Sequence, residues 1–165
     1  MRYLGAAVIP VLLSVLSVAA SFRIRRRARI LETTYMMLNE MKLTFEYACL
    51  PMYEAVSRLS EKSSYSETFI PECKRLLDSG TDFPAAWSAS VSTAKGLSRD
   101  EKQKLLQLGG FLGTSDLGGQ LSVMDMYIRS FDEYQKEARL VSKKYADTCI
   151  YAGLFCALGM FVMLI

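Results

Sequence analysis

Two long segments without a charged residue, one near each end of the chain, constrain the fold more than any other feature. The first extends from Tyr3 to Phe22 and the second from Thr148 to Ile165. A helix rises about 1.5 Å per residue, so about twenty apolar residues cross the roughly 30 Å hydrocarbon layer of a bilayer. We therefore expect a transmembrane anchor at residues 1–22 and a transmembrane helix at residues 146–165, flanking a domain at residues 23–145.

Basic residues lie on the domain side of both segments. They are Arg23, Arg25, Arg26, Arg27 and Arg29 after the first segment, and Lys143 and Lys144 before the second. Because positively charged flanks stay in the cytoplasm, we expect a cell-membrane protein with a cytoplasmic domain and both termini outside. A cleaved signal peptide is the alternative for the first segment, since residues 18–20 offer a small-residue site. Only Arg2 precedes that segment, however, which favours an uncleaved anchor.

The location of the charge argues against nucleic acid as a partner. The whole chain has a net charge of +3, but residues 30–142 hold 12 basic and 16 acidic residues, a net charge of −4. A nucleic-acid-binding domain carries its positive charge on the folded part. We therefore expect no nucleic-acid partner.

The available residue types argue against catalysis. The chain has no histidine, which removes the commonest general base and the commonest metal ligand. Adjacent acids such as Asp132 and Glu133 point to different sides of a helix and cannot share a proton. The four cysteines, Cys49, Cys73, Cys149 and Cys156, do not form a Cys-x-x-Cys pair of the kind that binds metal or acts in redox chemistry. We predict a non-enzymatic protein without a catalytic, cofactor-binding or metal site.

The apolar periodicity between the two segments predicts an all-α fold, a small antiparallel bundle of about six helices. We expect them at residues 28–49, 51–62, 67–77, 83–95 and 99–112 and from residue 117 onward. The apolar face of the first is formed by Leu31, Tyr35, Leu38, Met41 and Phe45, and that of the fifth by Leu105, Leu108 and Leu112. Asp82 can cap the fourth helix, and Ser98 with Glu101 is a capping-box pattern before the fifth. Trp87, the only tryptophan, is expected in the core rather than stacked on a ligand. Core packing is also favoured over a partner groove for the methionines and aromatic residues of the last helix, Met124, Met126, Tyr127, Phe131 and Tyr134.

The stretch from Leu105 to Leu121 contains five glycines between two helical patterns. Glycine costs roughly 1 kcal/mol relative to alanine inside a helix, so this density marks a break or a close backbone contact. We predict a tight corner in which Gly113 ends one helix and Asp116 caps the next. A phosphate-binding loop is excluded, because no Gly-Lys-Ser/Thr follows the glycines and no strand precedes them.

The same stretch resembles the stage III sporulation protein AB family, which is similar to the cytoplasmic F domain of type II secretion platform proteins. The residues at the family spacing are Gly109, Leu112, Gly113, Asp116 and Gln120, and further matches are Pro51, Glu54, Ala55 and Trp87. The resemblance covers essentially the whole chain. One departure is Thr44, where the family often has a glutamate.

The resemblance implies a membrane platform subunit of a secretion-like complex that acts in endospore formation. It implies a secretion-type ATPase and other membrane subunits as partners, with a homo-oligomer left open. The family-motif residues would then form a structural corner or a partner contact, and Pro51, Glu54 and Trp87 a packing or partner contact. The alternatives are a platform fragment of a type II secretion or pilus system and a holin-like membrane toxin, which would not need a patterned domain.

Overall fold

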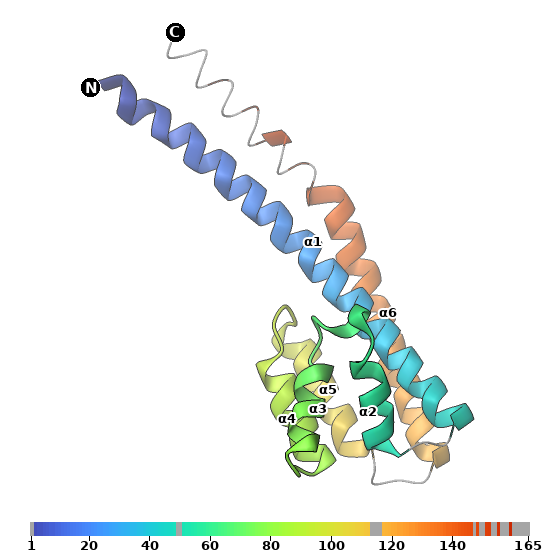
Figure 1. The fold of residues 1–165 in the computed structure, drawn as a ribbon. Coiled ribbons are helices and arrows are strands. Elements are labelled where there is room, and N and C mark those ends of the chain that lie inside the picture. Colours follow the sequence, from blue (N-terminus) through green and yellow to red (C-terminus); the bar gives the residue numbers. More distant parts are fainter. Residues whose placement is uncertain are drawn as a thin grey trace. The chain divides into compact units, whose positions relative to one another are not determined.

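The structure is a computed structural model of the chain, and it describes residues 2–48, 51–112 and 117–146 with the single positions 148, 151, 152, 155 and 159. For residues 2–14, 48, 117 and 146 it describes the backbone alone. The described residues form six α-helices and no strand, so the all-α prediction is confirmed for them. The helices are α1 (Arg2–Ala48), α2 (Met52–Ser60), α3 (Ile70–Asp78), α4 (Phe83–Thr93), α5 (Arg99–Phe111) and α6 (Leu117–Val141) (Figure 1). Short turns follow two of them, the 3₁₀ turn η1 (Ser63–Tyr65) after α2 and the π-helical turn η2 (Ser142–Ala146) after α6.

The chain divides into two compact units. One comprises Met1–Ala28 and Lys136–Ile165, and the other, which we call the helical domain, comprises Arg29–Gln135. Among the described residues, no helix is long and apolar enough to cross a membrane. The expected spans at residues 1–22 and 146–165 fall largely on positions whose side chains or placement lie outside the described part of the chain.

The first helix is longer than its sequence pattern suggested. The apolar face predicts a helix that begins at Ala28, whereas α1 runs without interruption from Arg2 to Ala48. The intervening arginines are good helix formers, and neither proline nor glycine occurs between residues 11 and 48. The arginine cluster is therefore part of a continuous helix rather than a linker.

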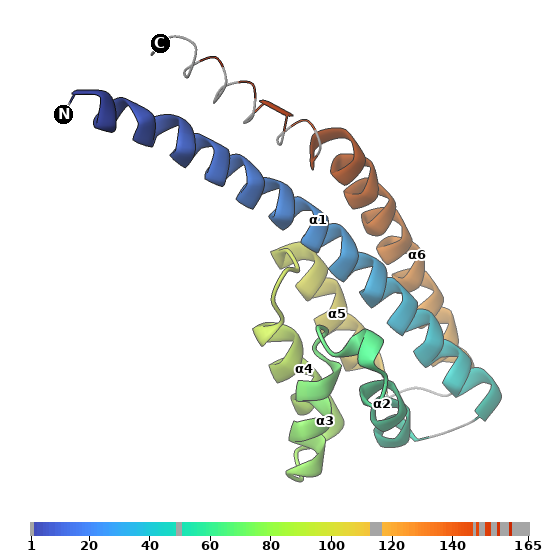
Figure 2. The same ribbon diagram turned by 45° about the horizontal axis from the view of Figure 1, so that its top comes forward.

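Inside the helical domain, helices that follow one another in the chain also lie next to one another. α2 contacts α3, α3 contacts α4, and α4 contacts α5 (Figure 2). An ion pair of 2.8 Å between Lys42 Nζ and Asp125 Oδ1 joins α1 to α6. The fully buried apolar side chains come from all six helices and include Leu38, Met41, Val56, Ile70, Trp87, Leu105, Leu108, Leu112, Met124 and Phe131.

The helix ends follow the expected local chemistry in part. Ser98 and Glu101 form the predicted capping box at the start of α5, with Glu101 N–H donating to Ser98 Oγ and Ser98 N–H to the Glu101 carboxylate. Gly80, after α3, has the positive φ of +88° that a turn glycine supplies. The prediction for Asp82 is wrong in its mechanism: Asp82 precedes α4, but its side chain makes no capping hydrogen bond.

Two other helix boundaries differ from the predictions. α3 begins at Ile70 rather than at Glu67, because Thr68 Oγ1 accepts from the Ile70 N–H just before Pro71. α4 ends at Thr93, before Gly96, which has a φ of +85° in the connection to α5. In α6 the core prediction is wrong for Met126, whose side chain is 56% exposed.

Candidate functional site

The contact between α4 and α5 is built around Trp87. Its side chain is completely buried, and its indole Nε1–H donates to the Leu105 carbonyl over 2.7 Å. Phe69 meets the indole edge to face, with ring centroids 4.9 Å apart, and the Phe83 ring lies at 5.5 Å. The structure thus places Trp87 in the core, where its polar atom is satisfied and its rings are enclosed.

Gly109 is the reason that the indole can lie so close to α5. A Cβ atom at Gly109 would stand 2.1 Å from Trp87 Cδ1, a distance that no real Cβ contact allows. Gly109 lies inside α5, which continues to Phe111, so this glycine marks a close contact and not a helix break. Gly110, its neighbour, has open space at the corresponding position.

The remaining motif residues fall into two groups. Leu112 is fully buried at the end of α5, and Gln120 lies half-buried in the first turn of α6. Gly113 and Asp116 lie outside the described residues, so the predicted corner between these helices stays a prediction. The structure therefore brings Gly109 and Trp87 into contact and places Leu112 in the same core.

Pro51 and Glu54 lie elsewhere, at the start of α2. The Pro51 carbonyl accepts hydrogen bonds from the N–H groups of Glu54 and Ala55, at 3.0 and 3.1 Å. Glu54 pairs with Arg58 on the next turn of the same helix, at 3.3 Å. Within the described part of the chain neither residue bonds to α4 or α5, so these two matches have a local role in starting α2.

A stripe of exposed apolar side chains runs along α1 opposite the core. We call it the outer stripe, and its members are Met36, Leu43 and Tyr47, which are 50%, 52% and 78% exposed. Their spacing of seven and four residues places them on one side of the helix. The buried residues Leu38 and Met41 lie on the other side. The sequence pattern did not indicate a surface role for these three residues, although they lie off the apolar face predicted for this helix.

A polar cluster joins α1 to the segment that follows α2. The Glu40 carboxylate accepts from Tyr65 Oη at 2.7 Å and from Lys62 Nζ. Partial burial opposes ionisation of Glu40, but the hydrogen bonds from Lys62 and Tyr65 outweigh it, so the pKa of Glu40 is lowered. Burial, together with the adjacent Glu40, raises the pKa of Tyr65 to about 12. The cluster fixes this segment against α1 through charge-assisted hydrogen bonds.

The described residues offer little for chemistry. Among them, no group of three or more Cys, Asp or Glu side chains could hold a metal ion. Cys73 is completely buried, and burial raises the pKa of its thiol to about 11 despite a hydrogen bond with Ser90. A thiol of this kind is not a nucleophile at neutral pH.

Comparison with known proteins gave one result. The sequence model of the family described as stage III sporulation protein AB matches residues 2–165. A search of curated proteins and a search of solved structures found no match.

Proposed function

Because the chain belongs to the stage III sporulation protein AB family and is thus sporulation-related, we propose that it is a non-enzymatic platform subunit of a membrane complex. In this proposal both apolar segments lie in the membrane, and the helical domain docks a cytoplasmic secretion-type ATPase. Other membrane subunits of the same complex are further partners.

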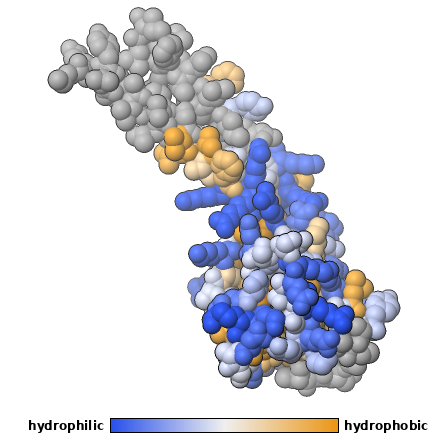
Figure 3. Space-filling view, in the orientation of Figure 1, coloured by the Kyte–Doolittle hydropathy of each residue, from blue (hydrophilic) through white to orange (hydrophobic). Residues whose placement is uncertain are grey.

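Membrane attachment is supported by the side chains of the first part of α1. Val15, Leu16 and Phe22 are large apolar residues with exposed fractions of 59%, 65% and 69%, directly before the arginine cluster. Figure 3 shows hydrophobic side chains next to a band of hydrophilic ones on the face that it draws. Apolar side chains exposed to this degree suit a lipid environment, and the arginines suit the cytoplasmic boundary.

A topology assay tests this attachment. Single cysteines introduced at Met1, Ser63 and Ile165, in a chain whose four native cysteines are replaced, report which side of the membrane each position occupies. In inside-out vesicles we expect an impermeant maleimide to label position 63 and not the two ends. Labelling of the ends with protection of position 63 contradicts the proposal.

Docking is supported by the outer stripe of α1, which is the observation that carries this part of the proposal. Three large apolar side chains stay half exposed or more, while Leu38 and Met41 on the other side of α1 are fully buried. Contiguous apolar surface on a soluble domain marks interaction sites, and Met and Tyr are enriched in such interfaces. The stripe is on the part of α1 farthest in sequence from the arginine cluster, which suits a partner from the cytoplasm.

Binding to the ATPase tests the docking role. Leu43→Ser with Tyr47→Ser removes the apolar surface of the stripe without touching the core, so we expect capture of the ATPase from detergent extract to fall at least tenfold. Met126→Ser is the matched control, because Met126 is equally exposed but lies on α6. Unchanged capture by the double variant, with unchanged thermal melting, contradicts the assignment of this surface.

A further inference from the structure

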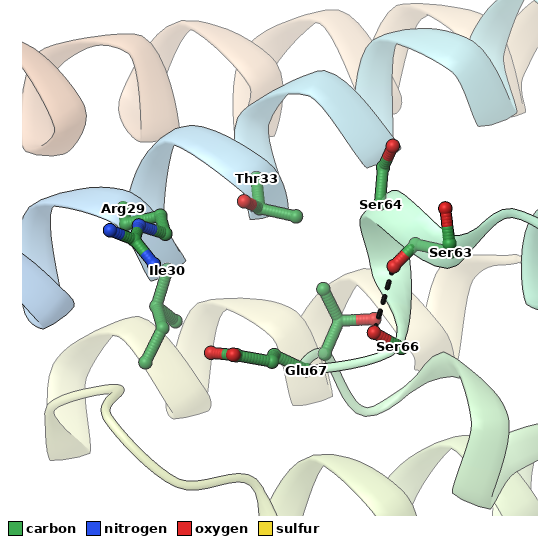
Figure 4. A pocket seen from close by; sticks show the side chains of 8 residues that line it. Arg29, Ile30, Thr33, Ser63, Ser64, Ser66 and Glu67 are labelled. Carbon is green, nitrogen blue, oxygen red and sulfur yellow. Dashed lines mark hydrogen bonds between the residues drawn. The ribbon is translucent and has the colours of Figure 1, made fainter.

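A small cavity in the helical domain has a lining that the docking role does not use. It lies between α1 and the segment that follows α2, and its volume is about 140 Å³ (Figure 4). Arg29 and Thr33 line it from α1, and Ser63, Ser64 and Glu67 from the other side. Pockets for drug-sized ligands measure roughly 300–1,000 Å³, so this cavity suits a small polar group.

Arg29 and Glu67, the two charged side chains of the cavity, have opposite signs, and both can bind a ligand. Neither Arg29 nor Glu67 forms a hydrogen bond or an ion pair with another described residue. A simple anion would be attracted by Arg29 and repelled by Glu67, and a simple cation would meet the reverse. A ligand that carries both charges satisfies both side chains, so the lining selects a zwitterion.

The hydroxyl groups indicate which anion the ligand carries. Ser66 and Thr68 use their hydroxyls on backbone carbonyls, at 2.8 and 2.6 Å, whereas Thr33, Ser63 and Ser64 have no partner among the described residues. Thr33 lies beside Arg29 on α1 (Figure 4), so its free hydroxyl adds to the five N–H donors of the guanidinium. A phosphate group offers more acceptor oxygens than a carboxylate, and arginine binds it in bidentate fashion.

The cavity is held open by contacts outside it. The Glu40 cluster anchors the serine-containing segment to α1 through Lys62 and Tyr65. The buried side chain of Ile30 supplies an apolar part of the lining, which suits a short methylene linker between two charged groups. A site whose walls are fixed before binding loses less entropy when the ligand enters.

We propose that this cavity binds a phosphate ester that carries a primary ammonium group, as the headgroup of phosphatidylethanolamine does. Arg29 and the Thr33 hydroxyl hold the phosphate, and Glu67 accepts hydrogen bonds from the ammonium. The same chemistry can come from a lipid headgroup or from a soluble phosphoethanolamine. The lipid as source rests on the proposed membrane attachment, since Arg29 lies seven residues after Phe22 on the same helix.

Binding of soluble probes tests the site itself. The full chain in a maltoside detergent, which has no phosphate or amine, is titrated with O-phosphoethanolamine, phosphocholine and inorganic phosphate. We expect saturable binding of O-phosphoethanolamine and at least tenfold weaker binding of the other two, because phosphocholine has no N–H donor and phosphate has no cation. Equal affinity for all three, or no binding of O-phosphoethanolamine, overturns the proposal.

Substitutions locate the binding. Arg29→Ala and Glu67→Gln should each weaken O-phosphoethanolamine binding at least tenfold, and both positions are exposed, so melting should not change. Arg99→Ala and Glu61→Gln remove exposed charges of the same kinds outside the cavity and serve as controls. A variant that binds as tightly as the unaltered chain, or controls that lose binding equally, overturns the assignment to this cavity.

Lipid exchange then separates the two sources. A photo-crosslinking residue at Ser66, which lines the cavity and whose hydroxyl is already used on the Ser63 carbonyl, should label phosphatidylethanolamine in nanodiscs and not phosphatidylcholine, which supports the lipid as source. If neither lipid is labelled but O-phosphoethanolamine still binds, the site is supported and its ligand is a soluble ester. Neither result depends on the ATPase, so failure of this site and failure of the docking role are distinguishable.

Discussion

Gly109 and Trp87 are complementary: the indole occupies the space that a side chain at position 109 would need. The Cβ position of Gly109 lies 2.1 Å from Trp87 Cδ1, and the indole Nε1–H reaches the carbonyl of Leu105 one turn earlier in α5. The closeness of α4 and α5 therefore depends on a glycine inside a helix, where glycine is otherwise unfavourable by roughly 1 kcal/mol.

Substitution of the two neighbouring glycines measures this contact. Gly109→Ala forces the indole or the helix to move, and we expect a loss of about 1–3 kcal/mol, the usual range for overpacking. Gly110→Ala is the matched control, because nothing lies within 4 Å of its Cβ position. It should be neutral or stabilise by up to about 1 kcal/mol through helix propensity. Denaturant unfolding followed by circular dichroism gives both values, and equal effects would contradict the close contact.

Truncation of the indole should be among the most destabilising single changes in the helical domain. Trp87→Ala removes a completely buried aromatic side chain, and we expect a loss of about 3–5 kcal/mol. In that background Gly109→Ala should cost much less than alone, since its Cβ then has space. Additivity in this double-mutant cycle would mean that the two positions do not interact.

The Glu40 cluster should make stability depend on pH in the alkaline range. The pKa of Tyr65 is about 12 in the folded protein and about 10 when unfolded, so the unfolded state releases the proton first as pH rises. Stability from this group is therefore complete below pH 10 and is lost between about pH 10 and 12, by on the order of 2 kcal/mol. Tyr65→Phe should flatten this part of the stability curve. An identical alkaline slope in the variant would contradict the assignment.

Glu40 acts in the opposite pH range. Its pKa is lowered in the folded protein, so its stabilising effect is present at neutral pH and is lost as pH falls below about 4.5. Glu40→Gln should destabilise the protein at pH 7 and reduce the slope of the acid limb. Glu133→Gln, an exposed change on α6, is the control, and equal acid slopes in both variants would contradict the role of Glu40.

Alkylation should reveal the burial of Cys73. Its thiol has a pKa of about 11 and no exposed surface, so iodoacetamide at neutral pH should not react until the chain unfolds. Peptide mass mapping before and after denaturation measures the modification of Cys73 separately from that of the other three cysteines. Rapid modification in the folded protein would show that the α3–α4 contact opens readily.

The helices and their buried faces were predictable because they depend on local patterns. The periodicity of Leu105, Leu108 and Leu112 and the Ser98–Glu101 capping box involve neighbours within a few turns, and both are confirmed. The role of Gly109 was not predictable, since the same glycine could break a helix or admit a neighbour. Only the position of Trp87, on another helix, decides between them.

The candidate surfaces were harder to predict from the sequence, because they too depend on residues that are far apart in the chain. Arg29 and Glu67 are separated by 37 residues, and no local pattern indicates that they line one cavity. The outer stripe could not be predicted because its residues are of the same types as core residues. Their exposure depends on which face of α1 the other helices cover. The resemblance identified the family correctly, since it rested on spacing over the entire chain.

The order of contacts along the chain has a consequence for synthesis. α2, α3 and α4 each contact the next helix in sequence, so each of these contacts can form as soon as that next helix is complete. α1 gains its ion pair to Asp125 from α6, and Lys42 precedes that residue by 83 positions. If translation stops before α6, Lys42 on α1 lacks this ion-pair partner. Within the helical domain, α6 is thus the helix that completes the fold, and chains truncated before it should be targets for chaperones and proteases.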